Sequence, residues 1–277
     1  MPTHFTTHTY EVNGIRLNVA EVGSGEALVF IHGWSNNWQG WTLLAEALAP
    51  HYKLYLLDLP GFGDSDRLES YSIDIEADII AAFVTKFVPK PKALLGASLG
   101  TIITARTLER YPQLTTNVIL LGTIFKQLSL KEAAAVYEKI LEFADRTEVA
   151  TRILGQTIKS PLTADLVEKF LNAYKFNKEH VDKYNLPGRR KISGKSYVQL
   201  GLSAGSFIME EFLQKASQKI LMIYGEADKY VRPADAEEIL KSIKSPNITL
   251  TIITKAGHNP AYEQPEKTAA VIKTFLN

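Results

Sequence analysis

Short apolar runs alternate with helical patterns through the first 121 residues of the chain. Two β-rich runs, Phe5 to Val12 and Ile15 to Val22, are joined by Asn13-Gly14, whose residues tolerate the positive φ angles of a tight hairpin. Continuous apolar runs typical of buried parallel strands follow at 27–31, 52–57, 91–95 and 117–121. Helical spacing of apolar residues fills the intervals at 38–48, 73–87 and 101–111. This alternation predicts a mostly parallel sheet covered by helices on both faces.

The alternation stops at Phe125 and resumes only near the end of the chain. Between Leu128 and about Lys215 we find only helical patterns, among them 133–144 and 166–174, and a turn-rich loop at 187–191. Strands and helices are predicted again at 219–224, 233–243, 248–253 and 265–276. We therefore expect an α/β core made of residues 1–124 and 216–277, interrupted by a helical cap of residues 125–215.

The strand predicted at 91–95 leads into a serine that lies between two glycines, in the segment Gly96 to Gly100 (Gly-Ala-Ser-Leu-Gly). This pattern between a buried strand and a helix predicts a nucleophile elbow, a sharp turn that lifts the serine hydroxyl clear of the sheet. Glycines are needed on both sides because a side chain at either position would crowd the turn. Ser98 is therefore the candidate nucleophile.

The same pattern occurs a second time, in Gly201 to Gly205 (Gly-Leu-Ser-Ala-Gly). The segment before it, Ser196 to Leu200, is half polar and is not typical of a buried parallel strand. Its flanks also belong to the predicted helical cap. We therefore expect Ser203 at the start or at a kink of a cap helix, without a role in catalysis.

Two residues near the end of the chain supply the partners that a serine nucleophile needs. Asp228 follows the strand predicted at 219–224, and His258 follows the strand predicted at 248–253. Since the carboxyl ends of parallel strands share one edge of a sheet, both residues should converge with Ser98. A serine hydroxyl needs an imidazole to take its proton and an acid to orient that imidazole. The chain order serine, acid, histidine is the order expected for this topology.

With these motifs in place, the chain resembles the α/β-hydrolases, and the matching positions are His32-Gly33-Trp34, Asp58 to Ser65, Gly96 to Gly100, Asp228 and His258. Within that superfamily it is similar to the carboxylesterases that hydrolyse pimeloyl-acyl-carrier-protein methyl ester. The resemblance implies an α/β-hydrolase fold, with a mostly parallel eight-stranded sheet, helices on both faces and an inserted helical cap. Thr101 departs from the pattern, because many such elbows have a further glycine there.

Acyl transfer also requires donors that stabilise a negatively charged oxygen. We expect the backbone N–H groups of Leu99, directly after the nucleophile, and of Trp34, in the loop after the strand at 27–31, to form this oxyanion hole. Substrate-binding side chains are predicted at Trp34, Phe125 and Tyr137. Further aromatic candidates for an apolar pocket in the cap are Phe143, Phe170, Tyr174, Phe176 and Phe207.

The composition narrows the range of partners. The 31 lysines and arginines nearly balance the 30 aspartates and glutamates, so nothing indicates binding to nucleic acid or to a membrane surface. The absence of cysteine excludes disulfides, thiolate metal sites and a cysteine nucleophile. Because no apolar run of about 18 residues occurs, we expect a cytoplasmic protein. The balanced charge favours a small-molecule ester as the substrate. We expect the protein to be a monomer or a dimer.

Several polar residues near the candidate site have a structural interpretation as well as a catalytic one. Glu226 is the alternative acid to Asp228, whereas His32 is more typical of a residue that fixes the oxyanion loop than of a base. Asp58 and Asp64 lie in a turn where aspartates commonly bind their own backbone. The cationic residues Arg189, Arg190, Lys191 and Lys195 are interpreted as a solvated loop, with a docking patch for an acidic carrier protein as the alternative.

The sequence therefore predicts a serine hydrolase that cleaves carboxylic esters through an acyl-enzyme on Ser98, with His258 and Asp228 as partners. This chemistry needs neither a metal nor another cofactor. The alternatives use the same triad for carbon–carbon bond or thioester hydrolysis, acyl transfer or cofactor-free perhydrolysis. A non-catalytic ligand-binding protein on the same fold is a further alternative. Haloalkane dehalogenases and epoxide hydrolases are disfavoured because they place aspartate at the position of Ser98.

Overall fold

The computed structural model describes residues 3–125, 131–230, 232–243 and 245–277. In this part of the chain eight strands form one sheet, in the order β1-β2-β4-β3-β5-β6-β7-β8. Strands β3 to β8 run parallel to one another, whereas β1 and β2 are antiparallel. The bounds are β1 (Thr6–Val12), β2 (Ile15–Val22), β3 (Ala27–Ile31), β4 (Lys53–Leu57), β5 (Ala93–Ala97), β6 (Asn117–Leu121), β7 (Lys219–Gly225) and β8 (Ile248–Ile253).

The predicted opening hairpin is confirmed. Asn13 and Gly14 have φ angles of 52° and 78°, the left-handed conformation that a two-residue hairpin turn requires at both positions. The turn pairs Val12 with Ile15, and β2 then pairs with β4 in the main sheet.

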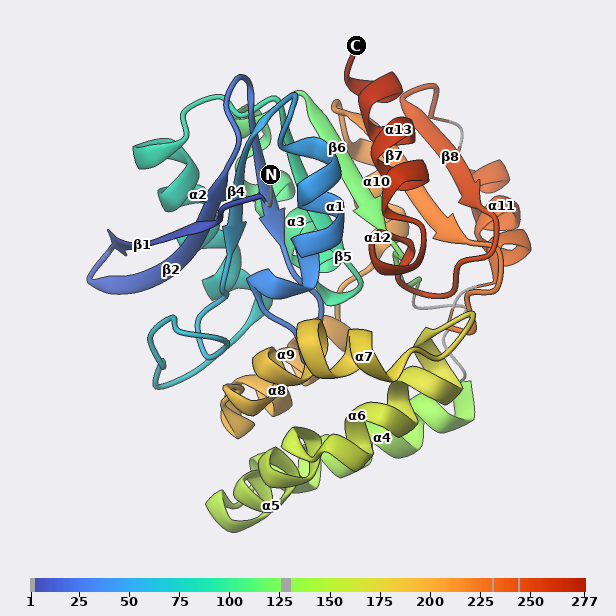
Figure 1. Ribbon diagram of the computed structural model, residues 1–277. Coiled ribbons are helices and arrows are strands. Elements are labelled where there is room, and N and C mark those ends of the chain that lie inside the picture. Colours follow the sequence, from blue (N-terminus) through green and yellow to red (C-terminus); the bar gives the residue numbers. More distant parts are fainter. Residues whose placement is uncertain (1–2, 126–130, 231, 244) are drawn as a thin grey trace.

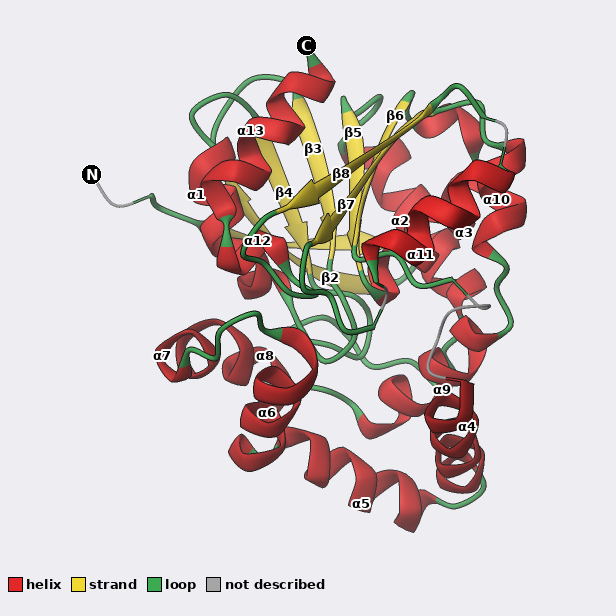
Figure 2. Ribbon diagram, turned by 90° about the vertical axis from the view of Figure 1, so that its right-hand side faces the viewer, coloured by secondary structure: helices red, strands yellow, loops and turns green. Residues whose placement is uncertain are grey.

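Helices cover both faces of the sheet, as Figure 2 shows. One face carries α1 (Thr42–Leu48) and α13 (Pro265–Leu276), and the other carries α2 (Ile73–Phe87), α3 (Leu99–Arg110) and α11 (Pro233–Ser242). In β3, Leu28 and Phe30 belong to the core cluster on the first face, whereas Val29 and Ile31 belong to the cluster on the second. Burial on both faces explains why the central strands are continuous apolar runs. The predicted α/β-hydrolase architecture is confirmed.

The segment between β6 and β7 is helical. It contains α4 (Lys131–Asp145), α5 (Glu148–Lys159), α6 (Pro161–Val167), the π-helix η3 (Glu168–Asn172), α7 (Lys178–His180), the π-helix η4 (Val181–Asn185), α8 (Leu186–Arg190), α9 (Gly194–Gly205) and α10 (Met209–Lys215). Figure 1 shows α4 to α9 gathered below the sheet, whereas α10 lies beside it and contacts α3. We propose that residues 125–215 form an inserted cap on the core. Across the described residues, no helix has the length and apolar character that crossing a membrane requires.

Two local predictions in this segment are wrong. The helix predicted over 166–174 is divided, because α6 ends at Val167 and the π-helix η3 follows it. The loop predicted at 187–191 is largely the helix α8, in which Pro187 lies in the first turn, where its missing N–H costs no helical hydrogen bond. Gly188 allows close packing there, since a Cβ at this position would lie 2.6 Å from Oδ1 of Asn37.

Candidate active site

Ser98 occupies the turn between β5 and α3. Its φ and ψ angles are 49° and −117°, a conformation that is strained for a residue other than glycine. Its backbone N–H donates a hydrogen bond of 2.9 Å to the carbonyl oxygen of Leu121, the last residue of β6. Strain of this kind persists where the surrounding structure enforces it, and it is concentrated at functional sites.

The glycines on both sides of Ser98 permit two close approaches. A Cβ at Gly96 would lie 2.3 Å from the carbonyl oxygen of Gly100, and a Cβ at Gly100 would lie 2.2 Å from that of Ile31. Gly100 therefore allows α3 to start directly against the end of β3. Thr101, the departure from the usual pattern, is fully buried, and its hydroxyl donates a hydrogen bond of 2.6 Å to the carbonyl oxygen of Ser98.

His258 and Asp228 form a buried pair beyond the ends of β8 and β7. Nδ1 of His258 lies 2.8 Å from Oδ2 of Asp228, and the two residues are only 8% and 3% exposed. The other carboxylate oxygen of Asp228 accepts a hydrogen bond of 2.8 Å from the backbone N–H of Tyr230. A carboxylate oxygen can only accept a hydrogen bond, so Nδ1 of His258 is the donor and carries the proton of the neutral imidazole. Nε2 is then the nitrogen with a free lone pair, which can take up a proton.

The backbone at the end of β6 connects this pair with the serine turn. A Cβ at Gly122, whose φ angle is 61°, would lie 2.9 Å from Cε1 of His258. The preceding residue, Leu121, accepts the hydrogen bond from the N–H of Ser98. Ser98 thus contacts Leu121 and His258 lies against Gly122, so both approach neighbouring residues at the end of β6. The parallel order β5-β6-β7-β8 brings Ser98, Asp228 and His258 to one edge of the sheet.

The loop after β3 lies against the serine turn. A Cβ at Gly33 would lie 3.3 Å from Cβ of Ser98, so the Gly33–Trp34 peptide runs beside the serine. His32 anchors this loop, because its Nδ1 lies 2.9 Å from the carbonyl oxygen of Gly33 and its Nε2 accepts a hydrogen bond from the N–H of Leu59. Burial lowers the pKa of His32 to about 4, and the imidazole is neutral near pH 7.

Comparison with known proteins agrees with this geometry. A family model described as the alpha/beta hydrolase fold matches residues 26–265. The chain belongs to the α/β-hydrolase family. Among curated relatives, the pimeloyl-[acyl-carrier protein] methyl ester esterases of Aeromonas salmonicida (strain A449) and Wigglesworthia glossinidia brevipalpis are 28% and 29% identical to the chain. The matches cover 94% and 92% of this chain and 99% and 95% of those proteins, which confirms the predicted resemblance.

A solved structure leads to the same conclusion for the fold. A thermophilic esterase from Thermogutta terrifontis matches this hydrolase with a TM-score of 0.74 at 20% sequence identity. The match covers 99% of this chain and 98% of the esterase, so the helical segment between β6 and β7 falls within the common architecture.

Trp34 lies where the hydrolase core meets the cap helices. Its ring is stacked on Tyr197 of α9 with a centroid distance of 4.3 Å, and its Nε1 donates a hydrogen bond to the carbonyl oxygen of Tyr197. Tyr137 of α4 meets Trp34 edge-on, and its hydroxyl lies 2.5 Å from that of Tyr197. Phe125 is fully buried in the main core. Pocket roles for Trp34, Tyr137 and Phe125 stay predictions.

The other aromatic candidates have different positions. Phe143, Phe170 and Tyr174 are 65%, 57% and 53% exposed, and their place in an apolar pocket stays a prediction. Phe176 packs beside a small cluster of Ala164, Val181 and Leu186 within the cap. Helical periodicity identifies an apolar face, but it does not say whether another element covers that face.

The acidic residues near the candidate site have separate roles. Glu226 is exposed, and its carboxylate accepts a hydrogen bond from the N–H of Lys255, so it does not replace Asp228 beside the imidazole. Asp58 is fully buried and accepts hydrogen bonds from the N–H groups of Trp38 and Asp64. Burial raises the pKa of Asp58, and these hydrogen bonds oppose the rise. Asp58 thus organises the loop after β4, as predicted.

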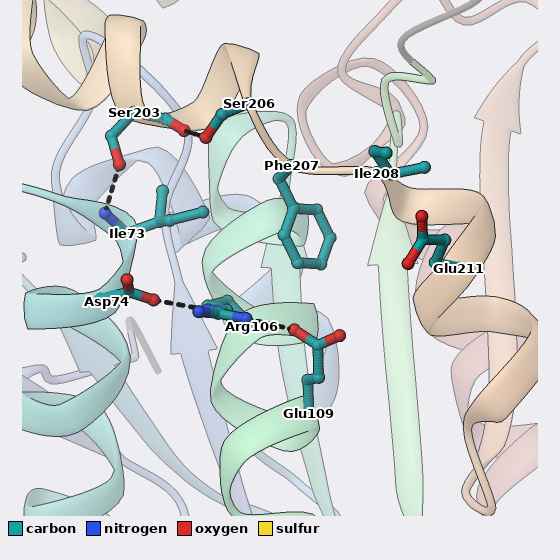
Figure 3. A pocket seen from close by; sticks show the side chains of 9 residues that line it. All are labelled: Ile73, Asp74, Arg106, Glu109, Ser203, Ser206, Phe207, Ile208 and Glu211. Atoms are coloured by element: carbon teal, nitrogen blue, oxygen red, sulfur yellow. Dashed lines mark hydrogen bonds and ion pairs between the residues drawn. The ribbon is translucent and has the colours of Figure 1, made fainter.

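Ser203, the centre of the second glycine-flanked motif, lies in the last turn of α9. The prediction that it starts or kinks a helix is wrong in detail. Figure 3 shows its hydroxyl directed at the N–H of Ile73, from which it accepts a hydrogen bond of 3.0 Å at the start of α2. The hollow beside it holds about 250 Å³ and is also lined by the ion-paired Asp74 and Arg106. Ser98, Asp228 and His258 do not line this hollow.

The largest error of the sequence interpretation concerns the cationic residues between Arg189 and Lys195. Arg190 and Lys195 are exposed as expected, and Lys191 is paired with Asp64. Arg189, by contrast, is only 4% exposed. A run of four nearby cations gives no signal that one of them is buried, because the burial depends on which distant residues cover α8.

Proposed function

We propose that this hydrolase is a serine esterase that cleaves carboxylic esters through an acyl-enzyme on Ser98. The observation that carries the proposal is the buried His258–Asp228 pair, with its 2.8 Å contact, beside the strained turn of Ser98. The curated relatives support the same reaction, since they are named as methyl ester esterases. An acyl group linked to a carrier protein, as those names describe, is a candidate form of the substrate.

In the first half of the proposed reaction, Oγ of Ser98 attacks the ester carbonyl carbon while Nε2 of His258 takes the hydroxyl proton. Asp228 holds the imidazole in the required tautomer and stabilises the imidazolium that forms. When the tetrahedral intermediate collapses, His258 returns the proton to the leaving alkoxide oxygen. The products of this half-reaction are the free alcohol and an ester of Ser98.

In the second half, a water molecule attacks the acyl carbon of Ser98 and gives one proton to Nε2 of His258. Collapse of the second intermediate breaks the bond to Oγ, and the proton returns to the serine. The balance is one ester and one water converted to one acid and one alcohol.

The oxyanion of both intermediates would accept hydrogen bonds from backbone N–H groups. The N–H of Leu99 lies at the start of α3, where the first N–H groups of a helix have no partner within the helix. The second donor in the proposal is the N–H of Trp34, whose peptide runs beside Ser98. His32 would keep this donor in place through its bonds to Gly33 and Leu59.

A fluorophosphonate probe tests the proposal directly, because it reacts much faster with an activated serine than with an ordinary hydroxyl group. We expect one adduct per chain, mapped by peptide mass spectrometry to Ser98. The matched variants are Ser98→Ala, which should not be labelled, and Ser203→Ala, which should be labelled like the original chain. Folded protein that remains unlabelled, or that is labelled at Ser203, would contradict the proposed mechanism.

A further inference from the structure

A guanidinium group is buried at the junction of the cap and the core. Arg189 in α8 is 4% exposed, and its Nε has no hydrogen-bond partner among the described residues. An arginine remains protonated in proteins, and withdrawing one of its charged donors from water without a hydrogen-bond acceptor is unfavourable. A buried cation with an unused donor is therefore prepared for an anionic ligand.

Three of the groups that act electrostatically on Arg189 are tyrosines that contact residues of the candidate active site. Burial lowers the pKa of Arg189, and Tyr197, Glu168, Tyr230 and Tyr137 oppose this fall electrostatically. The three tyrosines come from α9, the loop after β7 and α4. The ring of Tyr230 packs on the imidazole of His258 with a centroid distance of 4.5 Å.

On the other side, Tyr197 and Tyr137 both contact the ring of Trp34, and Tyr197 is stacked on it. Tyr230 thus contacts the proposed base, His258. Tyr137 and Tyr197 contact Trp34 of the proposed oxyanion loop. Arg189 itself belongs to α8, in the helical segment between β6 and β7.

The backbone that carries Arg189 is held against the same loop. Gly188 packs so closely on Asn37 that a Cβ would lie 2.6 Å from the amide oxygen. Asn37 is the N-cap of the short helix η1 (Trp38–Trp41), three residues after Trp34, and its side chain accepts a hydrogen bond from the N–H of Gln39. The position of α8 is therefore fixed relative to the oxyanion loop.

The tyrosines around Arg189 are neutral hydrogen-bonding groups. Burial raises the pKa of Tyr137 and of Tyr230 well above the usual tyrosine range, so neither hydroxyl supplies a negative charge. The partly exposed Glu168 also interacts electrostatically with Arg189. A guanidinium binds a carboxylate with two parallel N–H···O bonds, and phenol hydroxyls can donate to the same oxygens.

We propose that Arg189 binds a carboxylate group of the substrate. The preferred esters would then carry one free carboxylate in addition to the ester group and at a distance from it. The inference rests on the proposed esterase function, since it assigns the substrate class of that same site. Hemiesters of dicarboxylic acids are the simplest members of this class.

The experiment compares charged and neutral esters of similar length. The substrates are p-nitrophenyl hemiesters of dicarboxylic acids with four to eight carbons and the matching p-nitrophenyl alkanoates, and kcat/KM is measured for each. The variants are Arg189→Met and Arg189→Lys, with Arg190→Met as the control because Arg190 lies next in the chain and is exposed.

We expect the original chain to prefer a hemiester over its neutral counterpart. Arg189→Met should lower kcat/KM for the hemiester by about 10- to 100-fold, the size of a hydrogen-bonded charge contact, and change the neutral ester by less than about threefold. Arg189→Lys should restore part of the preference, and Arg190→Met should leave it unchanged. A preference for neutral esters in the original chain would overturn the proposal, and so would an equal loss on both substrates in folded Arg189→Met.

A binding measurement separates this proposal from the proposed reaction. Free dicarboxylates should raise the melting temperature of the Ser98→Ala protein and have no such effect on the Ser98→Ala, Arg189→Met double variant. If no ester is hydrolysed but the dicarboxylates still stabilise the protein through Arg189, the esterase function fails and the carboxylate site stands. If the dicarboxylates have equal effects on both proteins, the carboxylate site fails.

Discussion

The segments Gly96 to Gly100 and Gly201 to Gly205 share one sequence pattern and have unrelated structures. The first follows the buried strand β5, and its serine has a φ angle of 49° at the junction with α3. The second lies at the end of the helix α9. Ser203 is one of its helical residues, and its hydroxyl accepts a hydrogen bond from the N–H of Ile73. The strained turn at Ser98 occurs where the motif follows a buried strand, and it is absent where the motif ends a helix.

The glycines of the two segments differ in the same way. A Cβ at Gly100 would lie 2.2 Å from a backbone oxygen of β3, whereas a Cβ at Gly205 would have open space around it. In the first segment glycine is a requirement of close backbone packing, and in the second it is not. The comparison teaches that a short pattern has a fixed meaning only when its neighbours in space constrain it.

The largest expected difference between the segments is in catalysis. Ser98→Ala should lower kcat for p-nitrophenyl ester hydrolysis by about 10⁴-fold or more, because the proposed covalent intermediate can no longer form. Ser203→Ala should keep kcat within about twofold and cost about 1 kcal/mol of stability, since the N–H of Ile73 loses its acceptor. Steady-state kinetics and urea unfolding measure both effects. Similar losses of kcat in the two variants would remove the distinction.

The next effect concerns Asp228, the acid proposed to orient His258 beside Ser98. Asp228→Asn should reduce kcat by up to about 10⁴-fold, because the amide favours the wrong imidazole tautomer. Glu226→Gln is the matched control two residues away, and we expect nearly unchanged kcat since that side chain binds the N–H of Lys255. Circular dichroism would establish that both variants are folded. Inactivation by Glu226→Gln alone would transfer the acid role to Glu226.

The glycines provide a test that needs no substrate. Gly100→Ala should lower the free energy of unfolding by at least about 2 kcal/mol, because the methyl group would overlap backbone atoms on β3. Gly205→Ala should be neutral or stabilising by up to about 1 kcal/mol, since alanine is favoured over glycine in a helix and the space is open. Chemical denaturation measures both. A tolerated Gly100→Ala would show that the elbow is less tightly packed than the structure indicates.

The last effect is a pH dependence of stability through His32, which lies in the loop packed against the first segment. The folded-state pKa of about 4 lies below the usual value of about 6.5, so the unfolded chain takes up a proton that the folded chain refuses. The stability contribution is complete above about pH 6.5, and up to about 3 kcal/mol is lost as the pH falls to about 4. His32→Gln should flatten this part of the curve in urea titrations. His51→Gln, at an exposed position, should leave it unchanged.

The sequence by itself determined the elements whose signal is local. The Asn13-Gly14 turn, the continuous apolar strands and the glycines of the elbow each follow from backbone geometry within a few residues. The convergence of Ser98, Asp228 and His258 on one sheet edge was also predictable, since parallel strands place all their carboxyl ends together.

Only the tertiary structure decided which side of each cap helix is covered. Phe143 and Phe170 lie on apolar helical faces that no element covers in the described chain, whereas Arg189 lies in a cationic run and is buried. A helical period fixes the direction of a side chain relative to its helix axis, but burial depends on distant segments such as the loop of Trp34 and Asn37. The sequence therefore determined the proposed chemistry, and the packing of cap on core determined the surroundings of Arg189.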